Sequence, residues 1–492
     1  MNTTPTWQAP PPPIPPPSDN GPRAGVVALV LGLVVLLVAA VAVAIVVVSQ
    51  RDSGPEFPEE WDARVADLIP IVEEHRGLEF KHPVYVDFLP EDEFRAEMTT
   101  DEGELTEEDR DELDQFTAML RALGLIEADV DLFEQMNALS SEGTLGFFSF
   151  GDKRIRVRGS ELTPAVTLTM VHELTHALQD QHFDLAARFD EFDESEDGTA
   201  SSVFRGVVEG DASRVETAYF DSLTADEQTA IEESEEDEQG DIGEKLEEIP
   251  KVLLVMMGSS YALGEPLVTL AFEDGGNEAV DELFRNPPST EEHLMDPWTW
   301  LIDEDPAAEV AKPELQDGDE EFDSGEFGAL FLYLVLAERI GLNDALDAAD
   351  GWGGDHYVAV TRGDQTCITA DFVADTDRDL TEMDEALAAW SKEQPAGAAS
   401  VTRTGDQIRL ESCDTGEARL GSDSAQDALQ LVAIRSQMAS IWVQQGATPE
   451  QARCFSDGII REFTVEQLVD PEFGEDDPTV TQRVQQLAMG CA

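Results

Sequence analysis

The stretch TPAVTLTMVHELTHALQDQHF, residues 163–183, decides how the rest of this chain is interpreted. Thr163 is a favoured N-cap residue, and Pro164 suits the first position of a helix. Apolar residues then recur at helical spacing: Ala165, Leu168, Val171, Leu174, Ala177 and Leu178. This periodicity predicts a long helix with one face buried in the core.

Two histidines of this helix, His172 and His176, are four residues apart, so both imidazoles leave the same face about one turn apart. Two neutral imidazoles at that spacing can bind one Zn²⁺ at ~2.0–2.1 Å. Glu173 lies beside them, where its carboxylate can take a proton from zinc-bound water. The pattern predicts a catalytic zinc site, and the alternative is a pair of core-edge histidines bonded to carboxylates.

A third zinc ligand is required, because catalytic zinc takes three protein ligands and leaves one position for water. His182 lies six residues after His176 and faces another side of the helix. Glu209 is the better candidate, since Gly206 and Gly210 beside it suggest a place where another helix comes close.

Three other carboxylates near these positions have open roles. Asp211 and Glu216 lie on the same expected helix as Glu209 and are alternative ligands. Asp180, one turn after His176, is either a partner that orients an imidazole or a surface carboxylate.

The segment from His172 to Phe183, followed by residues 208–212, resembles a group of bacterial, notably actinobacterial, membrane-anchored metallopeptidases of gluzincin type. The resemblance covers roughly residues 60–380 and implies a zincin-like fold, peptidase activity, and Glu209 as the third ligand. Further patches match more loosely: residues 287–291, 325–326 and 351–355. One departure follows His293, where this chain has Asp296-Pro297 in place of a His-Pro pair.

The composition is strongly acidic, with 105 Asp and Glu against 30 Lys and Arg and a formal net charge of −75. Such a surface repels nucleic acid at any salt concentration, so DNA or RNA binding is excluded as a function. Carboxylates spread over every segment need screening, which favours a protein adapted to concentrated salt.

The N-terminal region predicts a membrane anchor. Residues 1–23 are Pro-rich and cannot pack a core, and residues 24–48 then form an uncharged apolar run. At ~1.5 Å per residue this run is long enough to cross a membrane as one helix. The alternative is a cleaved signal peptide that releases a soluble form starting near Ser49. Residues 49–57 are a linker, and the acidic, cysteine-containing remainder is expected outside the cell.

The remainder predicts an α+β fold, mainly helical with a small sheet. We expect a zincin-like domain over 58–395, a hairpin or linker over 396–425, and a small helical module over 426–492. The expected elements are strands within 84–88 and 146–157, helices over 105–123 and 202–223, a mobile loop over 224–248, and a hairpin over 356–372.

The four cysteines form no Cys-x-x-Cys pair, and outside the cell disulfides are the default. Of the three possible connectivities, we favour Cys367–Cys413 and Cys454–Cys491, because each pair joins neighbouring segments.

A peptidase also needs an oxyanion-stabilising group and a strand edge that holds substrate. Candidates for the first are Tyr261, His293, His356 and Tyr357. The strand at 154–157 is the expected edge, and its arginines are expected to relieve the local acidic field.

These observations together predict a single-pass membrane protein with an extracellular, zinc-dependent peptidase domain that acts on peptide or protein substrates. The alternative from another class is a cell-surface interaction or sensor protein on a zincin scaffold, with little or no turnover. The Glu between the two histidines argues against a purely structural metal site, which four Cys or His ligands would close.

The net charge generates a first prediction. Added NaCl screens the repulsion between carboxylates, so the melting temperature of the protein should rise between low and molar salt. Thermal unfolding followed by circular dichroism over a NaCl series measures this. A melting temperature that is flat or falls with salt contradicts adaptation to concentrated salt.

Overall fold

The computed structural model describes residues 55–491, apart from 127–129, 143, 194–198, 235–248, 304, 417–423, 471–472 and 474–476. The expected membrane helix at 24–48 lies outside the described residues. The described chain is α+β, as expected, with many helices and two small sheets.

The smaller sheet contains β1 (Tyr85–Leu89), β2 (Gly146–Ser149) and β3 (Arg154–Arg158) in the order β1-β3-β2. Strand β3 pairs in parallel with β1 and antiparallel with β2. The expectation that residues 154–157 form a sheet edge is therefore wrong, because this strand is central. Its arginines pair with local carboxylates: Arg154 binds Asp87 and Arg156 binds Asp152, so each offsets one nearby negative charge.

The larger sheet is antiparallel throughout and has the strand order β4-β5-β6-β8-β7. Its strands are β4 (Asp319–Gly325), β5 (Trp352–Arg362), β6 (Gln365–Ala374), β7 (Ala399–Thr404) and β8 (Gln407–Cys413). Strands β5 and β6 form the hairpin expected over 356–372. Strands β7 and β8 come from the segment expected as a hairpin or linker, and they extend the same sheet.

The helices make up most of the described chain, and the expected helices are present. They are α2 (Ile69–Arg76), α3 (Glu91–Met98), α4 (Glu107–Ala122), α5 (Leu132–Glu142), α6 (Pro164–Phe183), α7 (Leu185–Asp193), α8 (Ala200–Ser222), α10 (Lys251–Arg285), α11 (Glu292–Met295), α12 (Ala329–Ala337), α13 (Leu342–Ala349), α14 (Asp377–Glu393), α15 (Ala425–Gln444), α16 (Pro449–Glu462), α17 (Val465–Val469) and α18 (Pro478–Gly490), with short helical turns at Glu102–Glu104 and Thr299–Asp303. Residues 225–234 are also helical, so this part of the expected loop over 224–248 is a helix.

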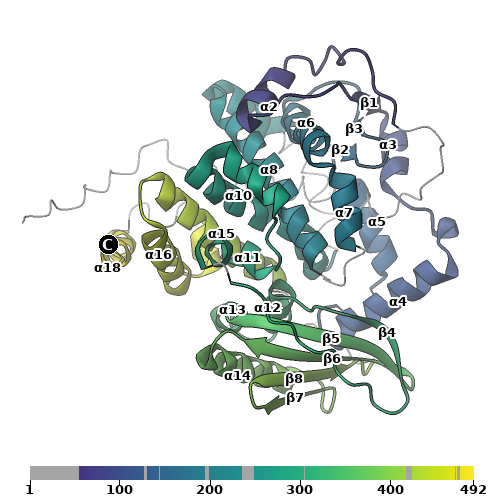
Figure 1. Cartoon of the computed structure of the whole chain (residues 1–492), viewed down its shortest axis with the longest axis vertical. Coiled ribbons are helices and arrows are strands. Elements are labelled where there is room, and N and C mark those ends of the chain that lie inside the picture. Colours follow the sequence, from purple (N-terminus) through teal and green to yellow (C-terminus); the bar gives the residue numbers. More distant parts are fainter. Residues whose placement is uncertain are drawn as a thin grey trace, which may run out of the picture.

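Helices α6, α8 and α10 form the centre of the molecule, above the larger sheet in Figure 1. Helix α6 begins as its sequence predicts, with the Thr163 hydroxyl accepting the Val166 N–H. Helix α10 is long and apolar enough to cross a membrane, but 72% of its most apolar window is buried inside the protein. It is therefore a core helix of the folded domain.

Helices α8 and α10 approach each other very closely at glycines. A Cβ on Gly264 of α10 would lie 1.9 Å from the carbonyl oxygen of Gly206, and one on Gly210 would lie 2.3 Å from the carbonyl carbon of Gly264. The glycines beside Glu209 do mark a close helix crossing, as the sequence suggested. The neighbouring helix at this crossing is α10.

Both expected disulfides are present. Cys367–Cys413 joins β6 to β8, and Cys454–Cys491 joins α16 to the end of α18. At the C-terminal end, α15 contributes buried residues to the main core, whereas α16 and α18 share a smaller cluster around Phe455, Ile459 and Ala488.

The glycine crossing generates the second prediction. Gly264→Ala places a methyl group against backbone atoms that cannot move aside, so the free energy of unfolding should fall by about 3 kcal/mol or more. Denaturant titration of the full chain measures the change. The matched control is Gly490→Ala in α18, where a Cβ meets nothing within 4 Å. It should change stability by at most about 1 kcal/mol. Equal stability of the two variants would contradict the tight crossing.

Candidate metal centre

His172 and His176 on α6 and Glu209 on α8 meet at one point in the core. The Glu209 Oε2 atom lies 3.2 Å from His172 Nε2 and 3.1 Å from His176 Nε2. Two ligand atoms that bind one tetrahedral zinc at ~2.0–2.1 Å are about 3.3 Å apart. The three side chains are 1%, 6% and 5% exposed as residues, so these polar atoms face one another away from bulk water.

The orientation of the His172 ring is fixed by contacts at its Nδ1 atom and at its ring face. Its Nδ1 lies 2.9 Å from the Glu216 carboxylate, and the Tyr261 ring stacks against it at a centroid distance of 6.1 Å. Because an ionised carboxylate only accepts, Nδ1 carries the hydrogen and donates it. In the neutral imidazole, the Nε2 lone pair then points at Glu209.

The His176 ring is fixed by an amide. Its Nδ1 lies 3.0 Å from Gln179 Oε1, and the Gln179 amide nitrogen donates to the Val208 carbonyl and to Asp211, each at 3.0 Å. Two acceptors around that nitrogen fix which end of the amide faces the ring. His176 Nδ1 is therefore the donor, and its neutral Nε2 lone pair also points at Glu209.

Three acceptors thus converge, and only positive charge can satisfy them. In the metal-free protein that charge is a proton. Burial acts to lower the pKa of His172, but its bonds to Glu209 and Glu216 hold that pKa well above the ordinary value. Burial likewise acts to raise the pKa of Glu209, but His176 and His172 hold it well below the ordinary value. A metal dication would place positive charge at the same point.

Glu173 lies beside this point and is held by the small sheet. Its Oε2 accepts the backbone N–H of Phe148, on the edge strand β2, at 2.7 Å. Burial raises the pKa of Glu173 to about 7, against the opposing effect of His176 and His172. A carboxyl with that pKa can both take and return a proton near neutral pH.

The alternative carboxylates have other partners. Asp211 is fully buried and forms ion pairs with Arg76 at 2.6 Å and Arg214 at 3.0 Å. Glu216 binds the far nitrogen of His172, so it is an orienting group. Asp180 binds Lys153 at 2.8 Å and has no contact with either imidazole, so of its two alternative roles the structure does not support that of an orienting partner.

The remaining candidates fall into two groups. His182 binds the Glu79 carbonyl, and His293 binds the Asp305 carbonyl, both away from the centre. His356 and Tyr357 lie on β5 in the larger sheet, also away from it. Tyr261 alone of the four oxyanion candidates lies at the centre, where its ring stacks on His172. Burial, and then the neighbouring Glu209, hold the pKa of its hydroxyl well above the ordinary value, so this hydroxyl keeps its proton.

The sequence reasoning missed the role of Gln179. The signal was present, because Gln179 lies three residues after His176 and therefore next to it on the helix surface. The role of Gln179 could not be predicted from the sequence, because it depends on contacts with Val208 and Asp211 of another helix.

Comparison with known proteins covers only the part of the chain outside this centre. Residues 314–424 match a family described as a domain of unknown function, DUF8575. This region contains the larger sheet and helices α12 to α14. Neither a curated protein nor a solved structure matches the chain.

The Asp211 ion pairs generate the third prediction. Asp211→Ala leaves Arg76 and Arg214 without this buried partner, so the free energy of unfolding should fall by about 3–5 kcal/mol. The control is Asp62→Ala, which breaks the exposed pair with Arg64 and should cost at most about 1 kcal/mol. Denaturant titration compares the two. Similar small losses in both variants would contradict a structural role for Asp211.

Proposed function

We propose that this chain is a zinc-dependent peptidase in which His172, His176 and Glu209 hold the metal and Glu173 is the general base. The observation that carries the proposal is the convergence of three acceptors, each backed by its own partner, next to a fourth carboxyl whose pKa is near 7. A pair of histidines buried for structural reasons does not need two oriented Nε2 atoms that face a carboxylate.

Zinc suits this ligand set better than other common metals. Two imidazoles and one carboxylate are the ligands of several catalytic zinc sites, and they leave one position open for water. Sites for Ca²⁺ or Mg²⁺ use oxygen ligands instead. When bound, zinc lowers the pKa of that water towards ~7 and polarises a substrate carbonyl.

The protein groups around the metal have separate tasks in this proposal. Glu173 takes the proton of the attacking water and later returns it to the leaving amine. Phe148 holds that carboxylate in place through its backbone N–H. Tyr261 has a buried hydroxyl beside Glu209 whose raised pKa keeps it protonated, and in this proposal that hydroxyl is the donor for the developing oxyanion.

The substrate in this proposal is a peptide that pairs with the edge of the small sheet. Strand β2 is an edge strand, and its Phe148 contacts the general base. An extended peptide can add to such an edge through main-chain hydrogen bonds. The expected edge at β3 is thus replaced by β2.

The compartment in this proposal is outside the cell. The two disulfides support it, because disulfides persist in oxidising compartments. The apolar run at 24–48 would then anchor the protein in the membrane.

The fourth prediction separates metal binding from catalysis. Glu173→Gln should retain about one zinc per chain and lower peptide hydrolysis by ~10²–10⁴-fold. Glu209→Ala should lose zinc and activity together. Metal analysis and mass spectrometry of a cleaved peptide library measure the two properties on the full chain.

The matched control is Glu265→Gln in α10. Glu265 is another buried carboxyl, but it accepts from Thr217 at 2.8 Å and does not reach the imidazoles. This variant should keep its zinc. Wild-type hydrolysis by Glu173→Gln would overturn the mechanism. A wild-type protein that binds zinc and cleaves no peptide would favour the interaction or sensor role.

A further inference from the structure

A second group of acidic side chains lies at the junction between the central helices and the larger sheet. Glu292 begins α11, Asp305 follows the turn at Thr299–Asp303, and Asp375 follows the last residue of β6. One carboxylate oxygen from each lies within 4.8 Å of the others. Segments far apart in the sequence thus bring three carboxylates to one point.

Glu292 is the unusual member of this group, because it is buried without a partner. The residue is only 5% exposed, and within the described residues no donor binds its carboxylate. The charges that act on it most strongly are acidic: Asp375, Asp305, Asp350 and Asp296. A buried charge that is left uncompensated costs several kcal/mol, so this arrangement requires a neutralising group.

The nearby arginines do not neutralise Glu292. Arg435 binds Asp350 at 2.6 Å, and Arg453 binds Asp296 at 2.8 Å. Each of these two arginines is thus paired with another carboxylate. Glu292 faces Asp305 and Asp375 instead.

The surrounding backbone holds the two aspartates in place. His293 Nδ1 faces the backbone N–H groups of Ser289 and Thr290, each at 3.3 Å, so its Nε2–H donates to the Asp305 carbonyl at 2.8 Å. This is the role of His293, which the sequence left as an oxyanion candidate. The ring therefore fixes the chain at Asp305.

The Asp375 side is fixed by the strand beside it. The Asp375 N–H donates to the Gly351 carbonyl at 3.2 Å. A Cβ on Gly353 would lie 2.9 Å from Asp375 Oδ1, so the glycine leaves room for this carboxylate. The loosely matched patch at 351–355 thus packs around the acidic group.

We propose that Glu292, Asp305 and Asp375 bind a Ca²⁺ ion. Carboxylate oxygens alone are the ligands of hard cations, and Ca²⁺ accepts 6–8 oxygens at ~2.3–2.6 Å in flexible geometry. Oxygens on opposite sides of Ca²⁺ are then up to about 5 Å apart, which accommodates the spacing here. Asp375 is exposed, so the ion has a path from solvent and can keep water ligands.

Burial, and then the neighbouring carboxylates, raise the pKa of Glu292 to about 9.

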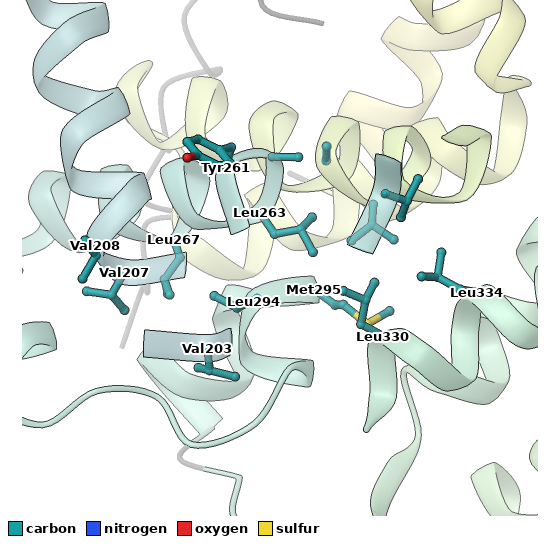
Figure 2. Close-up of a cluster of buried hydrophobic side chains, with 14 of the residues drawn as sticks. Val203, Val207, Val208, Tyr261, Leu263, Leu267, Leu294, Met295, Leu330 and Leu334 are labelled. Atoms are coloured by element: carbon teal, nitrogen blue, oxygen red, sulfur yellow. The ribbon is translucent and has the colours of Figure 1, made fainter. Parts of the chain in front are cut away.

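The ion joins the larger sheet to the helices of the zinc-binding candidate. Leu294, two residues after Glu292, packs directly against Gly206 of α8. A Cβ added to Gly206 would lie only 2.9 Å from the Leu294 side chain. Figure 2 shows Leu294 and Met295 in one apolar cluster with Val203 and Val207 of α8. A cation at Glu292 therefore stabilises α11, which lies between the sheet and the helix that carries Glu209.

The fifth prediction concerns calcium and uses the zinc-loaded full chain in molar NaCl, which screens binding to the acidic surface. Millimolar CaCl₂ should raise the melting temperature by several degrees, since a ligand that binds only the folded state stabilises it. Equal MgCl₂ should raise it less, because Mg²⁺ requires near-ideal octahedral geometry.

Variants locate the effect. Glu292→Gln and Asp375→Asn should abolish the calcium response and keep the zinc content. Glu292→Gln also replaces a carboxyl group that lies among other carboxylates by a neutral amide, so its melting temperature without calcium should be no lower than that of wild type. The control carries Glu107→Gln and Glu108→Gln on the exposed face of α4, and it should respond like wild type.

Three results would overturn the proposal: a wild-type melting temperature that calcium leaves unchanged, a full response in Glu292→Gln, or an equal loss of response in the control. An equal shift with MgCl₂ would overturn the assignment of calcium. None of these results bears on zinc binding at His172, so the two proposals stand or fall separately.

Discussion

The close crossing of α8 and α10 is the constraint on which the rest of the centre depends. At Gly206, Gly210 and Gly264 the two backbones touch, because no side chain lies between them. Glu209 is the neighbour of Gly210, and Tyr261 lies three residues before Gly264 on the same helix. The crossing therefore determines how far Glu209 reaches towards α6 and where the Tyr261 ring stacks on His172.

The orientation of each imidazole depends on a chain of contacts that extends away from the centre. His172 donates a hydrogen bond to Glu216 of α8. His176 donates a hydrogen bond to Gln179, and Gln179 donates one to Asp211. Asp211 in turn accepts from Arg76 at the end of α2. A residue more than ninety positions before the second histidine thus helps to fix its ring. Such outer contacts orient metal ligands and tune their basicity.

The sequence predicted the helix of the two histidines in detail, because its N-cap, its periodicity and its spacing are all local features. It also pointed to Glu209 through the adjacent glycines, which signal close packing whatever the partner helix is. The sequence did not predict strand order or side-chain partners that depend on contacts between distant segments. Strand order cannot be read from the strand at 154–158 itself, so its central position was missed. Nothing in the sequence around Asp180 and Asp211 indicates their partners. Asp180 binds a lysine, and Asp211 binds two arginines.

The Glu216 and Asp211 contacts have a further consequence for how charge is distributed in this protein. With a dication bound and Glu173 protonated, the charges of the dication, Glu209 and Glu216 sum to zero. Asp211 and Asp281 likewise balance Arg76 and Arg214. The interior around the histidines is thus electroneutral within a chain whose formal charge is −75. Salt therefore acts mainly on the solvation of the exterior, whereas pH also changes the charge beside His172 and His176, because burial raises the pKa of Glu173 to about 7.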